Sequence, residues 1–167
     1  MNFIQKKITL VRDKNQLSVL KFLSFLIVIL FAAACTLSAE QENRLNNQLS
    51  KYIKSYNTNN TLEYAGLTHP AVVRYYTSLG DSHFVQHFSN NTKEQTVNLY
   101  DPLFREMKSE GKWIERKYTI HKESDRESDK AYELYAISSD GGDNWFFLTE
   151  EDYFLKKIPL KHRLFSK

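Results

Sequence analysis

The apolar positions in the first half of the chain follow the period of a helix. Between residues 42 and 56 they recur every three or four positions, as Leu45, Leu49, Tyr52, Ile53 and Tyr56. This spacing places them on one face and predicts an amphipathic helix over residues 42–56. The turn-forming stretch NTNNT at residues 57–61 is expected to end it.

Two shorter helices are predicted next, mainly from their capping residues. The first has Thr68 as its cap, Pro70 in its first turn and Gly80 at its exit. The second follows at once and is capped by Asp81 or Ser82. Its apolar face would contain Phe84, Val85 and Phe88. The first half of the chain is therefore expected to hold three helices, the last two forming a tight pair.

The second half changes to the two-residue period of strands. Residues 112–123 and 130–138 alternate between apolar and polar positions, with the polar stretch ESDRESD as a hairpin loop between them. Tyr118 and Ile120 are expected to face inward. A short strand is predicted over residues 144–149, and a more ambiguous one over residues 96–100 that resumes after Pro102.

Helices followed by a run of strands are typical of the α+β class. We therefore predict about three N-terminal helices packed on one face of a curved antiparallel sheet of about four strands.

The segment before this domain has the order of an export signal: a basic stretch, an apolar run and then small residues. The apolar run at residues 22–34 has 13 residues without a charge, whereas a membrane-spanning helix needs about 20. An uncleaved anchor is therefore the less favoured alternative. We assign residues 1–39 to the export signal and residues 40–167 to a single domain.

Two cleavage positions remain open. Cys35 follows three alanines and resembles the lipidated cysteine of a bacterial lipobox, although Ala32 stands where that pattern usually has leucine. Cleavage after Ala34 would leave Cys35 as the lipidation candidate. Cleavage after Ala39 would leave a soluble exported protein. The predicted location is accordingly the cell envelope, as a periplasmic, secreted or lipid-anchored protein.

Composition excludes several classes of site. Cys35 is the only cysteine of the 167 residues, so the folded domain has neither a disulfide nor a thiolate metal site. The net charge is +3, but the segment through Cys35 carries +4 and the remainder −1, which gives no argument for nucleic-acid binding. The basic tail KKIPLKHRLFSK is expected to be a solvated terminus, with contact to anionic lipid or polysaccharide as the minority alternative.

The stretch YAISSDGGDNWFFL contains the pattern S-x-D-x-G-x-x-W. Its members are Ser138, Asp140, Gly142 and Trp145. Asp140 can accept hydrogen bonds from turn amides, glycines at 141 and 142 can adopt positive φ, and Trp145 can pack at the base. We interpret the four residues as a structural hairpin. The pattern also resembles the Asp-box of β-propellers, but a propeller needs several copies and this chain has one.

Other constellations give weaker signals. Asp140 and Asp143 could hold calcium or a sugar, although two carboxylates fall short of the oxygen ligands that calcium takes. His83 and His87 stand at i, i+4, a metal-compatible spacing, with His69 or His121 as conceivable third ligands. Tyr118, Tyr132 and Tyr135, with His121 and Glu133 nearby in sequence, could line a pocket, but aromatic residues also suit strands. No catalytic, cofactor-binding or metal residue is assigned.

One order of features is similar to a known superfamily. The chain has a helix, the stretch Y-x-x-x-x-H-P at residues 64–70, a further helix, and then long strands that end in S-x-D-G-G-x-x-W-x-F. This order resembles small exported bacterial proteins of the nuclear transport factor two-like superfamily, also called the cystatin-like α+β roll. The resemblance implies a cone-shaped roll with a pocket between sheet and helices. Its members include isomerases, dehydratases, transport adaptors and proteins of unknown function, so it implies no single activity.

These observations predict an exported cell-envelope protein with a non-catalytic domain that binds a small ligand or an envelope protein. The alternative is a small pocket enzyme of the same fold, of the isomerase or dehydratase type. A third hypothesis is an assembly subunit that forms a homodimer through its sheet. An exposed apolar sheet face would favour the dimer, and a closed pocket with converging tyrosine, histidine and acid groups would favour the enzyme. No cofactor is expected.

Overall fold

The computed structural model describes residues 37–89, 98–122 and 131–165. The predicted export signal up to residue 36, with Cys35, lies outside the described residues. So do the loop ESDRESD and residues 96 and 97 at the start of the ambiguous strand.

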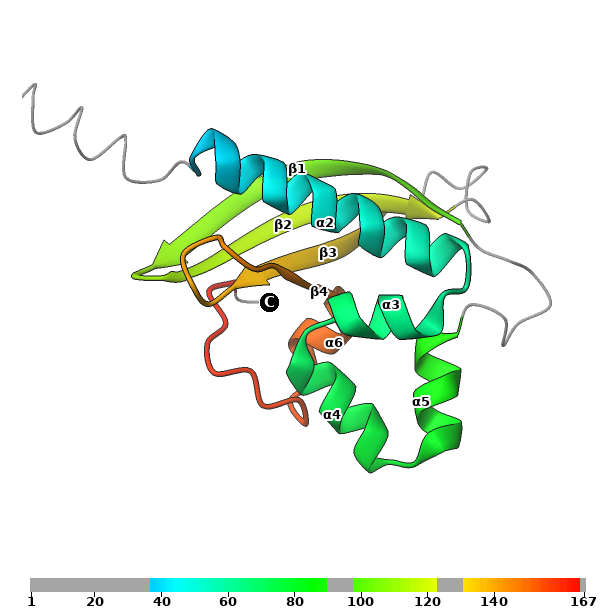
Figure 1. The fold of residues 1–167 in the computed structure, drawn as a ribbon. Coiled ribbons are helices and arrows are strands. Elements are labelled where there is room, and N and C mark those ends of the chain that lie inside the picture. The colour runs from blue at the N-terminus through cyan, green and yellow to red at the C-terminus, as the bar shows by residue number, and fades with distance from the viewer. Residues whose placement is uncertain (1–36, 90–97, 123–130, 166–167) are drawn as a thin grey trace, which may run out of the picture. The chain divides into compact units, whose positions relative to one another are not determined.

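Among the described residues, four helices precede the sheet (Figure 1): α2 (Ala39–Asn57), α3 (Thr61–Leu67), α4 (Pro70–Ser78) and α5 (Asp81–Phe88). The prediction of a long amphipathic first helix is confirmed by α2, which buries Leu45, Leu49 and Tyr52. Ser38 caps α2 in a capping box with Gln41: the Ser38 side chain accepts from Gln41 N, and the Gln41 side chain accepts from Ser38 N.

The described part of this half has one helix more than the three expected, because the stretch NTNNT ends one helix and also starts another. The Asn60 side chain accepts a hydrogen bond from Glu63 N and caps α3. Thr68 then ends α3, and His69 caps α4 by accepting from Ala71 N through Nδ1. Gly80, with a φ of 105°, occupies the N-cap position of α5, and no side chain caps that helix. Thr68 is therefore not the N-cap of α4, and neither Asp81 nor Ser82 is the N-cap of α5, contrary to the sequence prediction.

The sheet has four strands in the order β1-β2-β3-β4, each antiparallel to its neighbour. They are β1 (Leu99–Glu110), β2 (Trp113–Lys122), β3 (Ala131–Ser138) and β4 (Phe146–Thr149). The helices pack against this open sheet, which confirms the α+β prediction. Tyr118 and Ile120 of β2 are each 3% exposed, as their inward position predicted.

Strand β1 is longer than the sequence pattern predicts. It runs for 12 residues through Pro102, and its pairing with β2 shifts register between Tyr100 and Leu103 and again between Phe104 and Glu106. Asp101 has a φ of 49° beside the first shift. Such irregularities accommodate a proline in a strand, because the proline lacks the amide that regular pairing uses, and β1 lies at the edge of the sheet.

The two faces of the sheet are covered by different parts of the chain. The face that contains Ile114, Tyr118 and Leu134 packs against the N-terminal helices. The opposite face contains Glu115, Tyr135 and Ile137. It is covered in part by α6 (Glu150–Phe154) and by residues 155–165.

The prediction that the basic tail is a solvated terminus was wrong for its apolar positions. Ile158 is fully buried, and Leu160 and Phe165 are 8% and 5% exposed. The Arg163 side chain donates to the carbonyl oxygens of Tyr153, Leu155 and Ile158, which holds the segment in an irregular path. Lys156, Lys157 and Lys161 are exposed, because the chain turns its apolar side chains toward the sheet.

Candidate functional site

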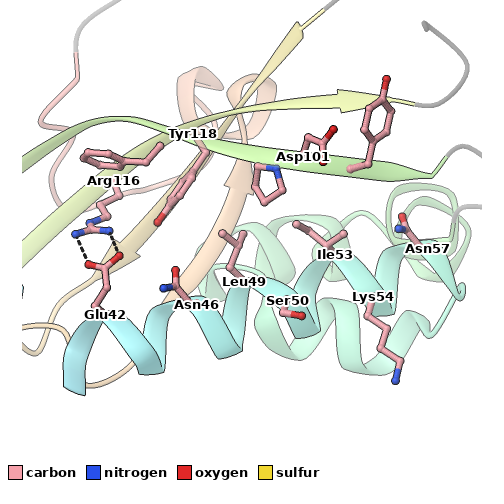
Figure 2. Close-up of a pocket in the computed structure, with 13 residues that line it drawn as sticks. Glu42, Asn46, Leu49, Ser50, Ile53, Lys54, Asn57, Asp101, Arg116 and Tyr118 are labelled. Atoms are coloured by element: carbon pink, nitrogen blue, oxygen red, sulfur yellow. Dashed lines mark hydrogen bonds and ion pairs between the residues drawn. The ribbon is translucent and has the colours of Figure 1, made fainter. Parts of the chain in front are cut away.

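A hollow of about 740 Å3 lies between α2 and the outer strands β1 and β2. We call it the α2–β1 groove. It is lined by Glu42, Asn46, Leu49, Ser50, Ile53, Lys54, Asn57, Tyr100, Asp101, Pro102, Phe104, Arg116 and Tyr118 (Figure 2). Its volume falls within the range of small-molecule sites in proteins.

One face of α2 forms the whole length of the groove. The lining positions from Glu42 to Asn57 are spaced by three or four residues, and they extend for about 22 Å at the rise of an α-helix. Leu49 is buried and Ile53 half-buried, so together they give the groove an apolar floor. Asn46, Ser50 and Lys54 are exposed along the same helix and form a polar rim.

An ion pair joins α2 to β2 at one end of the groove. Arg116 Nη1 and Nη2 donate to the two carboxylate oxygens of Glu42, at 2.7 and 2.6 Å (Figure 2). The Arg116 side chain is 9% exposed and that of Glu42 is 39% exposed. This bidentate geometry fixes both side chains, and the local charges balance.

An amide side chain joins α2 to β1 at the other end. Asn57 Nδ2 donates to Leu99 O at 2.9 Å, and Asn57 Oδ1 accepts from Leu99 N at 2.7 Å. The amide therefore satisfies both backbone groups of Leu99 at the start of an edge strand. Between these two tethers the groove separates α2 from β1.

Two buried polar atoms at the ion-pair end have no hydrogen-bond partner among the described residues: Arg116 Nε and Tyr118 Oη. Burial raises the pKa of Tyr118, against the opposing effect of Arg116, so the phenol keeps its proton at neutral pH. The guanidinium is near enough to act on this pKa, but the two groups do not make a hydrogen bond of good geometry. Buried polar atoms are rarely left unpaired in proteins, so this pair needs an explanation.

Phe104 covers the same end of the groove from β1. The Cζ atom of Arg116 lies 4.8 Å from the centre of the Phe104 ring, a cation–π distance. Phe104 is nevertheless 46% exposed, and its neighbour Leu103 is 53% exposed. Phe104 lines the groove whereas Leu103 does not, so at this end the β1 side of the groove presents an aromatic ring, in contrast to the polar rim on α2.

The residues predicted as a structural hairpin lie together at the turn between β3 and β4. Ser138 Oγ donates to Asp140 Oδ1 at 2.8 Å and accepts from Gly142 N at 2.8 Å. Asp140 Oδ1 also accepts from the amides of Asp143 and Asn144, at 3.1 and 3.0 Å. Burial raises the pKa of Asp140, but the hydrogen bonds, that from Asn144 first, outweigh it and lower the pKa to about 2.

The turn is also joined to α2. Gly141 and Gly142 have φ of 84° and 98°, which favours glycine at both positions. Trp145 is 1% exposed, and its Nε1 donates to Gly142 O at 3.1 Å, while its backbone amide donates to Gln48 Oε1 at 2.9 Å. A Cβ atom on Gly142 would lie 3.3 Å from the Gln41 side chain, so the helix approaches closely here.

The described residues do not assemble the calcium or sugar site considered from Asp140 and Asp143. The Asp140 carboxylate accepts from the turn, and Asp143 Oδ1 accepts from Arg44 Nη2 at 2.8 Å. No group of three or more metal-ligating side chains occurs within residues 37–89, 98–122 and 131–165.

The histidines considered as metal ligands are placed apart. His87 Nε2 lies 3.1 Å from Asp152 Oδ2, and its ring stacks on Tyr76 with 3.6 Å between centres. The Nδ1 of His83 lies 3.5 Å from Ser82 Oγ. His69 is the helix cap described above, and burial lowers its pKa to about 4, with a further contribution from Arg74. His121 lies on β2 beside Tyr100.

The tyrosines considered for a pocket are divided between three places. Tyr118 lines the α2–β1 groove, and Tyr132 lines a second cavity of about 230 Å3. Tyr135 lies on the opposite face of the sheet, where its hydroxyl donates to Glu133 at 2.6 Å. The second cavity contains further tyrosines that the sequence pattern did not single out, Tyr52, Tyr56 and Tyr64. The Tyr52 and Tyr64 hydroxyls are 3.0 Å apart and satisfy each other.

The sequence pattern alone does not predict the groove, although it contains a signal that points to it. Arg116 occupies an inward position in the alternation of β2, between Ile114 and Tyr118. A charged residue at such a position needs a partner on the covering helix. Glu42 is that partner: it stands three residues before Leu45 and seven before Leu49, on the same side of α2, whereas Glu40, the other acid of the helix, does not share this spacing.

No protein-family model, curated protein or solved structure matches this chain. No helix in the part of the chain that the structure describes is long and apolar enough to cross a membrane.

Proposed function

We propose that this protein is an exported, non-catalytic domain of the cell envelope that binds an amphipathic small ligand in the α2–β1 groove. The observation that carries the proposal is the cavity of about 740 Å3. Its floor of Leu49 and Ile53 suits an apolar body, and its rim of exposed polar side chains suits a polar group. Export is supported by the basic and apolar N-terminal sequence.

The arrangement of the charged groups favours binding over catalysis. Both oxygens of Glu42 accept hydrogen bonds from Arg116, so this acid is not free to transfer a proton. The described lining residues include no histidine, and Asp101 is exposed at the far end from Arg116. The pocket enzyme remains the alternative, and turnover that depends on Tyr118 or Asp101 would favour it.

We also propose membership of the nuclear transport factor two-like superfamily, supported by the order of helices followed by a four-stranded antiparallel meander. A homodimer through the sheet has less support. The face opposite the helices is covered over Tyr135 and Ile137, and beyond them it presents the ion pair of Lys117 and Glu133.

The test of groove binding is titration with 1-anilinonaphthalene-8-sulfonate, a fluorescent aromatic anion that brightens in apolar sites. We expect saturable binding to the unmodified protein and its loss in Asn46→Trp, where the new side chain fills the groove. Asn47→Trp is the matched control, because Asn47 is an exposed neighbour on α2 outside the groove lining. Equal binding by both variants, or no saturable binding at all, would contradict the proposal.

A further inference from the structure

The ion-pair end of the α2–β1 groove contains two buried polar atoms, on neighbouring side chains that influence each other, and neither makes a hydrogen bond of good geometry with the described residues. Arg116 is 7% exposed and Tyr118 is 3% exposed, and both line the groove. The Nε of one and the Oη of the other lack a partner. In Figure 2 the ring of Tyr118 slants from β2 toward α2, with its hydroxyl at the end where Arg116 lies.

The chemistry of the two atoms restricts what can satisfy them. The guanidinium Nε–H can only donate, and the Tyr118 phenol keeps its proton and can donate as well. The phenol oxygen could also accept, but the Nε–H cannot, so an acceptor oxygen is the one group that could pair with both atoms. A buried donor without a partner lowers the stability of the unliganded fold. A ligand oxygen that accepts from it removes this cost, so the hydrogen bond contributes more to the binding free energy than one formed at an exposed site.

The charge of the site favours a neutral acceptor. Glu42 already balances the charge of Arg116 through two hydrogen bonds. An added carboxylate would place a second negative charge beside Glu42 in a partly buried position, with no second cation there among the described lining residues. Lys54 lies toward the other end of α2, near Asn57. A carbonyl oxygen of an ester or an amide meets the requirement without this cost.

The rest of the groove indicates what is attached to the carbonyl. From Tyr118 the floor continues along Leu49 and Ile53, with Pro102 on the strand side. This floor is apolar along the length of the helix, which matches a hydrocarbon chain better than a compact polar molecule. The Phe104 ring packs over Arg116 at this end and is 46% exposed, so it forms part of the wall beside the two polar atoms.

We infer that the α2–β1 groove takes a neutral acyl compound, an ester or amide of a fatty acid, whose carbonyl oxygen accepts hydrogen bonds from Arg116 Nε and Tyr118 Oη. This inference rests on the proposed function, since it names the class of ligand for the same groove.

The experiment compares three probes of similar chain length by isothermal titration calorimetry with the full-length chain in detergent-free buffer. The probes are methyl octanoate, octyl methyl ether and the octanoate anion. The ester offers the carbonyl oxygen, the ether only a weaker acceptor, and the anion a charge. We expect the ester to bind about three- to tenfold more tightly than the ether, the range of one net hydrogen bond. The anion should bind more weakly than the ester.

Tyr118→Phe removes one donor and keeps the ring. It should reduce the affinity for the ester about three- to tenfold and leave the ether unchanged. Tyr75→Phe is the matched control, because Tyr75 lies on α4 outside the groove lining and should change neither affinity. Thermal unfolding of each variant establishes that the fold is retained.

The outcomes separate the two proposals. Equal binding of ester and ether overturns the carbonyl assignment, and so does unchanged ester affinity in Tyr118→Phe, which would mean that a buried water satisfies the donors. Tighter binding of octanoate than of the ester overturns the neutral-ligand assignment. In each of these cases groove binding survives if Asn46→Trp still abolishes it. Failure of every probe, the fluorescent one included, overturns both proposals.

Discussion

The phenol of Tyr153 donates a 2.6 Å hydrogen bond to Oε2 of Glu115, a carboxylate with no exposed surface at the centre of the sheet. The same carboxylate accepts from Trp113 Nε1 at 2.7 Å and from Leu164 N at 3.1 Å. Tyr153 Oη in turn accepts from Phe165 N at 3.0 Å. A buried acid is tolerated here because three donors satisfy it, and these donors come from β2, α6 and the C-terminal segment.

Removing the Tyr153 hydroxyl should loosen the C-terminal segment from the sheet. Tyr153→Phe leaves Glu115 with one donor fewer and Phe165 N without its acceptor, so we expect a loss of about 1–3 kcal/mol in the free energy of unfolding. Urea denaturation measures it. Tyr75→Phe should change stability by less than about 0.5 kcal/mol. Equal stability of the two variants would show that the buried acid does not depend on Tyr153.

Asp140→Ala tests the structural interpretation of the hairpin. The variant loses the bonds to the Asp143 and Asn144 amides, and we expect it to cost about 1–2 kcal/mol of unfolding free energy, as for other lost capping and turn bonds. A variant that stays fully stable but loses a bound ion or sugar would contradict this interpretation.

The pKa of Asp140 adds a pH signature. Its value in the fold is about 2, against 3.8 for an unperturbed aspartate. The folded state therefore binds fewer protons than the unfolded state between these values, and the stability supplied by Asp140 is lost as the pH falls from about 4 to about 2. The stability difference between the parent protein and Asp140→Ala should shrink over this interval.

His69 should make the fold sensitive to mild acid. Its pKa is about 4 in the fold and 6.5 when unperturbed, because burial disfavours the charged ring. Its Nδ1 accepts from Ala71 N and cannot do so once protonated. The unfolded state thus takes up the proton first, and stability falls as the pH is lowered from about 6.5 to about 4.

The matched variant for this prediction is His69→Asn, which keeps a capping acceptor and does not titrate. Urea denaturation should give similar stability for both proteins at about pH 7 and a more stable variant at about pH 5. Parallel curves at the two pH values would mean that His69 does not titrate with folding.

Ser38 bears on the position at which the chain is processed. Cleavage after Ala39 would remove Ser38, the capping residue of α2, and Leu37, which packs against the core. A chain that begins at Glu40 should be less stable than one that begins at Leu37 by about 1 kcal/mol or more. Mass spectrometry of the protein from cells should then find a mature start before Leu37, such as Cys35. A start at Glu40 would contradict this expectation, and an intact Met1 would refute cleavage altogether.

Tyr118→Phe should leave the unliganded fold at least as stable as the parent, with a gain of about 1 kcal/mol. The reason is that the variant deletes a buried hydroxyl that has no partner among the described residues. Thermal and urea unfolding without ligand measure the change. A loss of more than about 1 kcal/mol would mean that the hydroxyl already has a partner, such as a buried water.

The helices and strands that could be predicted were those with a long regular period. The spacing of Leu45 and Leu49 predicts α2, and the alternation around Tyr118 predicts β2. Helix α3 could not be predicted with equal ease, because Asn60 serves as a helix cap within a stretch that reads as a turn. In the same way, Pro102 and the bulges of β1 interrupt the pattern of a strand that is continuous in space.

The candidate site was harder to predict because its residues meet only through tertiary packing. Glu42 and Arg116 are 74 positions apart, and Asn57 and Leu99 are 42 apart. The burial of Glu115 was hard to predict for the same reason. The C-terminal residues that cover it have the composition of a charged terminus, and only the fold shows that Ile158 and Phe165 are buried. The hairpin at Asp140, by contrast, is local, and its short-range hydrogen bonds follow the order of its sequence motif.

The two tethers between α2 and the sheet have a consequence for how a ligand would be bound and released. Because Glu42–Arg116 and Asn57–Leu99 hold the helix at both ends, the separation of the groove walls is set when the protein folds. The conformational entropy of ordering the site is then lost before any ligand arrives, which raises affinity without adding a contact. A groove held in this way would take up and release a ligand without movement of α2 away from the sheet.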